Sequence, residues 1–262
     1  MKFLISFLLI FNTFAYEEIS SHTNFYKKVT HYALKNKVAP SDILVIYDID
    51  NTLLRFKTSF ASDQWFNWQK DQIKKGCPKH CIAKSVGGVL QYSYNATFLS
   101  RMLLVEKEIP SLIRSLQEAN YGVVALTSRG PVNHPATIRE LNRNGVDFDK
   151  RNAPKWPFST KLNGRKVRYA DGVFLTSGLN KGEMLTYLIN RPNLKKKYKA
   201  IFFLDDRLKH VKHMDKWFKG KLDVNSYRLT TTDKIVKAFE ESDKKEVIRV
   251  GEEFKALMKD LN

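Results

Sequence analysis

Two aspartates that stand two residues apart at the end of an apolar run are the first candidates for chemistry in this chain. Asp48 and Asp50 directly follow the apolar run 43–47. Residues two apart on an extended chain point to the same side, so both carboxylates face one crevice. Close like charges are costly unless a cation or a shared proton compensates them. Mg²⁺ prefers oxygen ligands and meets this need, although an acidic turn that ends a strand has the same pattern.

A hydroxyl-rich segment follows a second apolar run. Thr127, Ser128 and Arg129 come directly after residues 122–126. A hydroxyl can bond one phosphoryl oxygen, and a guanidinium can bind phosphate through two parallel hydrogen bonds. A local turn or helix N-cap is the alternative for Thr127, and a surface salt bridge is the alternative for Arg129. Taken alone, the segment favours the turn or cap for Thr127 and does not decide between the two alternatives for Arg129.

A lysine and a second pair of aspartates complete the set. Lys181 begins a predicted helix over 181–189, where its charge could neutralise a phosphate and a nucleophile; a solvated surface lysine is the alternative. Asp205 and Asp206 follow the apolar run 200–204. One or both could complete the metal site, and a strand-end turn is again the alternative. The sequence leaves open which of the two would bind the metal.

Apolar, β-rich runs alternate with helical patterns along most of the chain. Strands alternating with helices predict a parallel sheet in a Rossmann-like, doubly wound α/β fold. Ligands in such folds bind beyond the carboxyl ends of the strands, which is where the polar clusters stand. The predicted strands are 43–47, 122–126, 173–176, 200–204 and about 227–229; the predicted helices are 17–37, 111–119, 135–143, 181–189 and about 244–260, with a hairpin turn at Asn163-Gly164.

The first 15 residues have the pattern of a secretory signal peptide. Lys2 gives a positive start, residues 3–11 are almost wholly apolar, and Thr13-Phe14-Ala15 ends the segment with small residues that a signal peptidase reads. The apolar stretch is too short to span a membrane, and no later segment is long enough. We predict removal of residues 1–15 and export to the periplasm or out of the cell; an uncleaved anchor is the alternative.

Residues 57–105 are rich in aromatic side chains and stand between the first two predicted strands. We expect them to form a mainly helical insertion, with 16–56 and 106–262 making the core domain. Cys77 and Cys81 lie in this insertion and are the two cysteines of the chain. Their spacing is not that of a redox or haem motif, which leaves a local disulfide or two free thiols.

The formal net charge is +18. Strong basicity can indicate binding to nucleic acid or to an anionic surface. The lysines are spread along the whole chain and no nucleic-acid-binding motif accompanies them, so solvated surfaces and anionic substrates account for the charge. The charge therefore does not indicate nucleic acid as the partner, without excluding it, and is compatible with a small anionic substrate.

The order of these clusters resembles the haloacid dehalogenase (HAD) superfamily, phosphatase type, and an uncharacterised exported bacterial branch of it. The pattern is strand–Asp-x-Asp-x-Thr, strand–Thr, lysine at a helix start and strand–Asp-Asp, over residues 43–206. The resemblance implies a HAD core with a small, mainly helical cap inserted after the first strand. It also implies that Asp48 is the nucleophile that forms an aspartyl-phosphate and that Asp50 is the general acid and base.

The resemblance also assigns ligands. Mg²⁺ would be held by Asp48, the main-chain carbonyl of Asp50, and Asp205 or Asp206. The phosphate group would be held by Thr127, Ser128, Arg129 and Lys181. The predicted function is an exported, Mg²⁺-dependent phosphomonoester hydrolase. A phosphotransferase on the same scaffold and a catalytically silent, secreted binding protein with a basic surface are the alternatives.

Overall fold

The computed structural model describes residues 16–148, 152–192 and 197–260. The predicted signal peptide, residues 1–15, lies outside these ranges. Within the described ranges, none of the helices has the length and apolar character needed to cross a membrane.

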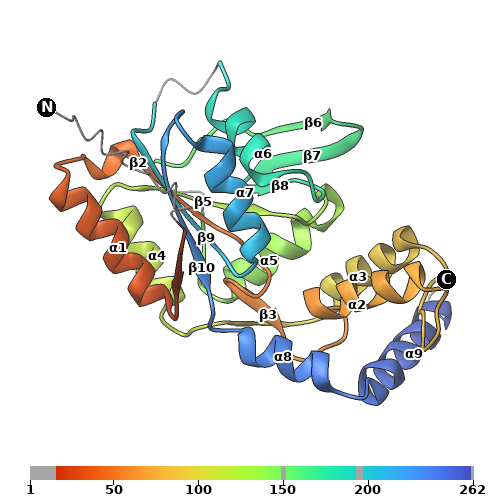
Figure 1. The fold of residues 1–262 in the computed structure, drawn as a ribbon. Helices are drawn as coiled ribbons and strands as arrows, with labels where there is room; N and C mark the ends of the chain where they lie inside the picture. The colour runs from red at the N-terminus through yellow and green to blue at the C-terminus, as the bar shows by residue number, and fades with distance from the viewer. Residues whose placement is uncertain (1–15, 149–151, 193–196, 261–262) are drawn as a thin grey trace, which may run out of the picture.

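A mostly parallel sheet forms the centre of the molecule (Figure 1). Its strand order is β1-β10-β9-β2-β5-β8-β7-β6, and only the β6–β7 and β7–β8 pairs are antiparallel. The bounds are β1 Glu17–Ile19, β2 Ile43–Tyr47, β5 Gly122–Thr127, β6 Phe158–Leu162, β7 Arg165–Ala170, β8 Val173–Leu175, β9 Ala200–Asp205 and β10 Asp223–Leu229. The Rossmann-like α/β fold expected from the alternating strands and helices is confirmed.

Helices cover both faces of this sheet, which explains why β2, β5 and β9 are buried along their whole length. On one face lie α1 (His22–Lys35) and α4 (Ile109–Glu118); on the other lie α6 (Lys181–Ile189) and α7 (Leu208–Phe218) (Figure 1). Helix α5 (His134–Arg143) follows β5. Two separate apolar clusters, one on each face, fill these layers.

Most predicted elements are present, but the helix predicted over 17–37 differs at its start. Residues 17–19, predicted as helix, form β1 and pair with the far edge of β10, and α1 begins only at His22. The change occurs at Ser21, whose Oγ accepts the N–H of Asn24 at 3.1 Å and caps the helix. The predicted hairpin turn is confirmed: Asn163 and Gly164 both have positive φ, +44° and +77°.

The insertion forms a helical unit to one side of the sheet (Figure 1). It contains α2 (Asp63–Lys74) and α3 (Val86–Leu99), and a short antiparallel ribbon, β3 (Leu54–Phe56) with β4 (Met102–Leu104), connects it to the core. Cys77 and Cys81 form a disulfide in the loop between the two helices.

The end of the chain packs against the insertion, although the prediction assigns it to the core. Helices α8 (Asp233–Glu241) and α9 (Lys245–Asp260) lie beside α2 and α3, away from the sheet (Figure 1). One apolar cluster contains side chains of both the insertion and these C-terminal helices, because α8 and α9 cover the aromatic side chains of the insertion. Its members include Phe60, Trp65, Val89, Phe239, Val247 and Phe254.

Glu140 of α5 fastens the end of the insertion to the core. Its Oε2 accepts the main-chain N–H of Met102 at 2.7 Å, and the carboxylate also pairs with Arg139 at 3.0 Å and with Arg143. Burial opposes the charge of Glu140, but the hydrogen bonds from Arg143, Met102 and Arg139 outweigh it and lower the pKa of the carboxyl below its ordinary value. Glu140 is 1% exposed, so water cannot replace its carboxylate as the acceptor for the N–H of Met102.

Replacement of this carboxylate should therefore destabilise the fold. We expect Glu140→Gln to lower the free energy of unfolding by about 1–3 kcal/mol at neutral pH, since buried donors lose a charged acceptor. The stabilisation is complete above the ordinary pKa of 4.5 and is lost as the pH falls through the lowered folded-state pKa. Urea unfolding at a series of pH values measures both effects.

A matched change at an exposed glutamate provides the control. Glu118→Gln, at the end of α4, should alter the free energy of unfolding by less than about 0.5 kcal/mol. Equal losses in the two variants would contradict the role assigned to Glu140.

Candidate metal and phosphate site

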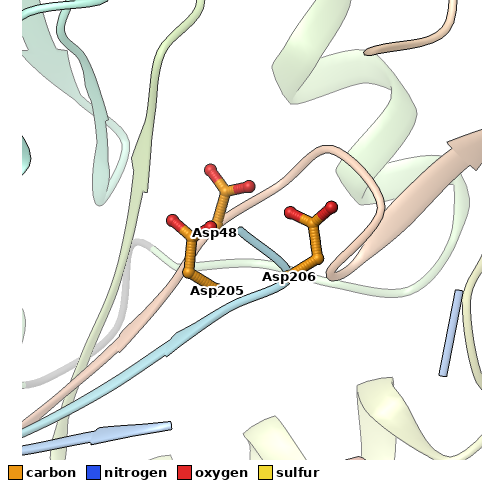
Figure 2. Close-up of side chains that lie close together, drawn as sticks. All are labelled: Asp48, Asp205 and Asp206. Atoms are coloured by element: carbon orange, nitrogen blue, oxygen red, sulfur yellow. The ribbon is translucent and has the colours of Figure 1, made fainter. Parts of the chain in front are cut away.

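Three carboxylates converge at the carboxyl edge of the sheet (Figure 2). Tyr47 of β2 lies opposite Leu204 of β9, so the residues that follow these strands emerge side by side. The N–H of Asp48 donates to the carbonyl of Leu204 at 2.9 Å, which fixes the first aspartate. One carboxylate oxygen from each of Asp48, Asp205 and Asp206 lies within 4.8 Å of the others.

A buried lysine joins two of these carboxylates. The Nζ of Lys181 donates to Oδ1 of Asp48 and to Oδ2 of Asp205, both at 2.6 Å, and the residue is 2% exposed. Its position follows from the start of α6, where Oδ1 of Asn180 accepts the N–H of Glu183 at 3.1 Å. A buried ammonium group requires such partners, so the two ion pairs hold the loops after β2, β8 and β9 together.

Asp205 is fully engaged by the protein. Besides Lys181, its Oδ1 accepts the N–H of Arg207 at 2.8 Å, and Nδ1 of His210 lies 3.0 Å from its Oδ2. Burial opposes its charge, but Lys181 and His210 outweigh burial and hold the pKa of Asp205 well below its usual range. This carboxylate is therefore ionised and its oxygens already have donors.

Asp206 has the opposite environment. Its Oδ1 is buried and has no hydrogen-bond partner among the described residues. Burial, followed by the charges of Asp205, Asp63 and Asp48, raises the pKa of Asp206 well above its ordinary value. A buried carboxylate oxygen without a donor is the kind of atom that a cation completes.

Asp48 also carries charge that the protein compensates only in part. Burial raises its pKa to about 7, the charges of Asp205 and Asp50 add to this effect, and Lys181 opposes it. Three close carboxylates beside one lysine leave an excess of negative charge, and the atoms that could bind a cation are hard carboxylate oxygens. Asp48 and Asp206 therefore fit a divalent ion such as Mg²⁺. Asp205 lies beside them but is held by Lys181.

Arg129 binds the predicted acid and base. Its Nε and NH2 groups donate to the two oxygens of Asp50 at 2.9 and 2.8 Å, and its NH1 group donates to Oγ1 of Thr137 at 2.9 Å. NH2 also contacts the sulfur of Met102 at 3.1 Å. The predicted phosphate ligand thus holds Asp50 in this structure, and Asp50 remains 26% exposed toward the edge of the sheet.

The two predicted hydroxyl ligands, Thr127 and Ser128, have different environments. Thr127 is buried, its Oγ1 accepts the N–H of Arg129 at 3.2 Å, and its carbonyl accepts both the N–H and the hydroxyl of Thr176. Ser128 is exposed. Since β5 pairs with β2, both residues lie at the same edge as Asp48. All of the predicted site residues are therefore gathered at one edge of the sheet.

The sequence prediction did not include two residues that contact the site. His210 contacts Asp205, and the only sequence feature that could have indicated this is its position in the first turn of the helix after Asp205-Asp206. Tyr94 of α3 lies over the loop after β5: a Cβ at Gly130 would be 2.7 Å from its hydroxyl oxygen. Only the richness of the insertion in aromatic residues hinted at Tyr94, since its contact joins distant segments.

The edge opens onto a cleft of about 970 Å³. Asp206 lines this cleft, together with residues of α2, the disulfide loop and α8. Arg207 of the core pairs with Asp63 of α2 across it. The cleft is thus shared by the core, the insertion and the C-terminal helices.

Loss of the buried lysine should be costly. We expect Lys181→Met to lower the free energy of unfolding by about 3–5 kcal/mol in the absence of divalent ions, because two buried carboxylates lose their counter-charge. Lys199→Met is the control, since Lys199 makes an exposed pair with Asp42 at 2.9 Å and should cost less than about 1 kcal/mol. Similar losses in the two variants, measured by urea unfolding, would argue against a buried charge cluster.

Binding of Mg²⁺ should stabilise the folded protein. An ion present at a hundred times its Kd adds about 2.7 kcal/mol to the free energy of unfolding and raises Tm. We expect Asp206→Asn to remove most of this Mg²⁺-dependent rise in Tm, whereas Asp243→Asn, an exposed aspartate of the α8–α9 linker, should retain it. An unchanged Tm of the unsubstituted protein over millimolar Mg²⁺ would contradict the metal site.

Comparison with known proteins places the chain in a different family from the one predicted. Residues 21–262 match the family model described as "Protein of unknown function (DUF2608)", and no curated protein matches the chain. The predicted placement in the HAD superfamily is wrong, because the match is to this family and none is to that superfamily. Short acidic motifs at strand ends arise in many doubly wound sheets, so their order alone did not identify the family. The chain belongs to the DUF2608 family.

Proposed function

We propose that the protein is an exported, Mg²⁺-dependent phosphomonoester hydrolase with Asp48 as its nucleophile. The observation that carries the proposal is the set of three carboxylates within 4.8 Å of one another beside a single buried lysine. A purely structural ion pair requires one carboxylate per lysine. Three carboxylates leave negative charge for a divalent cation to balance, and a cation beside a nucleophile, a lysine and hydroxyl groups suits phosphoryl transfer.

In the first step, a carboxylate oxygen of Asp48 attacks the phosphorus atom of the ester. A bond forms between Asp48 and phosphorus, and the bond from phosphorus to the leaving oxygen breaks. Asp50 gives a proton to that oxygen, which leaves as an alcohol. Mg²⁺ held by Asp48 and Asp206 would supply positive charge for the phosphoryl oxygens. Thr127, Ser128 and Lys181 are the proposed donors to those oxygens.

In the second step, water attacks the phosphorus of the aspartyl-phosphate. Asp50 takes the proton from this water, the bond between Asp48 and phosphorus breaks, and inorganic phosphate leaves. Arg129 donates to both oxygens of Asp50 and so positions this carboxylate beside Asp48; one of these hydrogen bonds would have to open for Asp50 to carry the proton that it gives in the first step. Each residue returns to its starting state at the end of the cycle.

The proposed export has independent support. Cys77 and Cys81 form a disulfide, and such bonds persist chiefly in oxidising compartments. A periplasmic or secreted enzyme meets that condition, in agreement with the signal pattern predicted for residues 1–15.

Hydrolysis of an aryl phosphate tests the proposed function. With Mg²⁺ the protein should release phosphate, EDTA should abolish the release, and Asp48→Asn should lower kcat/KM by at least about 10³-fold because the nucleophile is lost. Asp42→Asn is the matched control, since Asp42 precedes the same strand at its opposite end and should leave kcat/KM within about twofold.

Retention of activity in Asp48→Asn would refute the assigned nucleophile. Absence of turnover from folded, Mg²⁺-loaded protein would instead favour the alternative of a binding protein.

A further inference from the structure

The cleft that Asp206 lines is also lined by four lysines without a part in the proposed reaction, and two of them are Lys79 and Lys244. Lys79 belongs to the loop that the disulfide closes, and Lys244 joins α8 to α9. They come from segments far apart in the sequence. The packing of α8 and α9 on the insertion brings them together.

A series of ring contacts connects the two lysines. His80, which follows Lys79, stacks on Trp68 with 6.5 Å between ring centroids. Trp68 meets Phe239 edge to face at 6.3 Å, and Nζ of Lys244 lies 4.8 Å from the centre of the Phe239 ring. The ammonium group of Lys244 therefore stands over one end of this aromatic series, and the other end is the residue that follows Lys79.

Lys244 is a buried cation without a carboxylate partner among the described salt bridges. It is 7% exposed, and its Nζ donates to the carbonyls of Glu240 and Ser242 at 2.9 and 2.7 Å. The neighbouring Asp243 pairs with Lys245 instead. Burial and the charge of Lys79 lower the pKa of Lys244, although Asp243 and Glu240 oppose this shift. An anion between the two lysines would supply the missing counter-charge.

The backbone that carries Lys79 is already fixed. Its N–H donates to Oε1 of Gln72 at 3.2 Å, the N–H of Cys77 donates to the carbonyl of Gln72 at 2.7 Å, and the disulfide closes the loop. Binding of an anion therefore requires ordering of the side chain only.

We infer that Lys79 and Lys244 form a second anion-binding subsite, so that the substrate carries another phosphate or carboxylate group besides the phosphate that is hydrolysed. The inference rests on the proposed function, because it places the reacting phosphate at Asp48 and the second anion in the adjoining cleft. Asp206, Lys79 and Lys244 all line this cleft of about 970 Å³, and Asp206 connects it to the carboxylates at Asp48. The substrate class is then a phosphomonoester with two separated anionic groups.

The test compares alkanediol bisphosphates of increasing chain length with the matched monophosphates, in the presence of Mg²⁺. For at least one chain length, kcat/KM of the bisphosphate should exceed that of the monophosphate by about tenfold, the value of one charge-assisted contact. Lys79→Ala and Lys79→Glu should remove this advantage. Lys79 is exposed, so both variants should fold. Lys74→Ala, also exposed and on α2 but outside the cleft lining, should keep the advantage.

The possible results separate the two claims. Equal kcat/KM for both members of every pair, or an undiminished advantage in both Lys79 variants, would overturn the subsite while leaving the hydrolase proposal intact. If no ester turns over, the hydrolase proposal fails, and calorimetry then decides the subsite: about tenfold weaker binding of a bisphosphate to Lys79→Ala supports it, and equal or undetectable binding overturns it.

Discussion

The ion pairs of Lys181 are the interaction on which the rest of the site depends. Its ammonium group joins Asp48 after β2 to Asp205 at the end of β9, and it reaches them from the first residue of α6, after the loop that follows β8. Charges this deeply buried persist only when they are paired, so the three loops have one favourable arrangement. The arrangement leaves Asp206 with an oxygen that no described donor reaches. Asp205 thus has donors to both of its oxygens, Asp48 shares Lys181 with it, and Oδ1 of Asp206 has no donor among the described residues.

A second layer of contacts connects this edge of the sheet to the insertion. Arg129 binds Asp50 and also touches Met102, whose main-chain N–H is bound by Glu140. On the other side of the site, Arg207 pairs with Asp63 at the start of α2. The position of the insertion is therefore coupled to the groups that hold the aspartates. Such coupling gives the cleft a defined shape beside Asp206.

The sequence predicted the sheet well because its strands are long apolar runs. Residues 43–47 and 200–204 have no polar interruption, and the polar residues that follow them mark the edge at which strands end. Lys181 was found at a helix start, and Asn180 caps that helix. The sequence could not show that Lys181 faces two aspartates or that Arg129 faces Asp50, because these contacts join residues 133 and 79 positions apart.

Other features depended on packing that no local pattern records. The prediction of helix for residues 17–19 was wrong because these residues form a strand only through pairing with the edge of β10, which no local pattern records. The packing of α9 on the insertion could not be predicted, because the sequence does not show which aromatic side chains the insertion leaves uncovered. This packing determines where Lys244 lies. The family itself was predicted wrongly, because the fold and a few short motifs do not by themselves identify a family. The proposed hydrolysis is therefore argued from the geometry of the site and not from the family.

The most direct test of the central claim is to trap the covalent intermediate. The protein is mixed with a phosphomonoester and Mg²⁺, quenched in acid within a single turnover, and digested with trypsin for mass spectrometry. If Asp48 is the nucleophile, we expect one added phosphoryl group on the peptide of residues 38–55, located at Asp48 and absent from Asp48→Asn. Turnover with a phosphoryl group on another residue, or with none on the protein, would contradict this assignment.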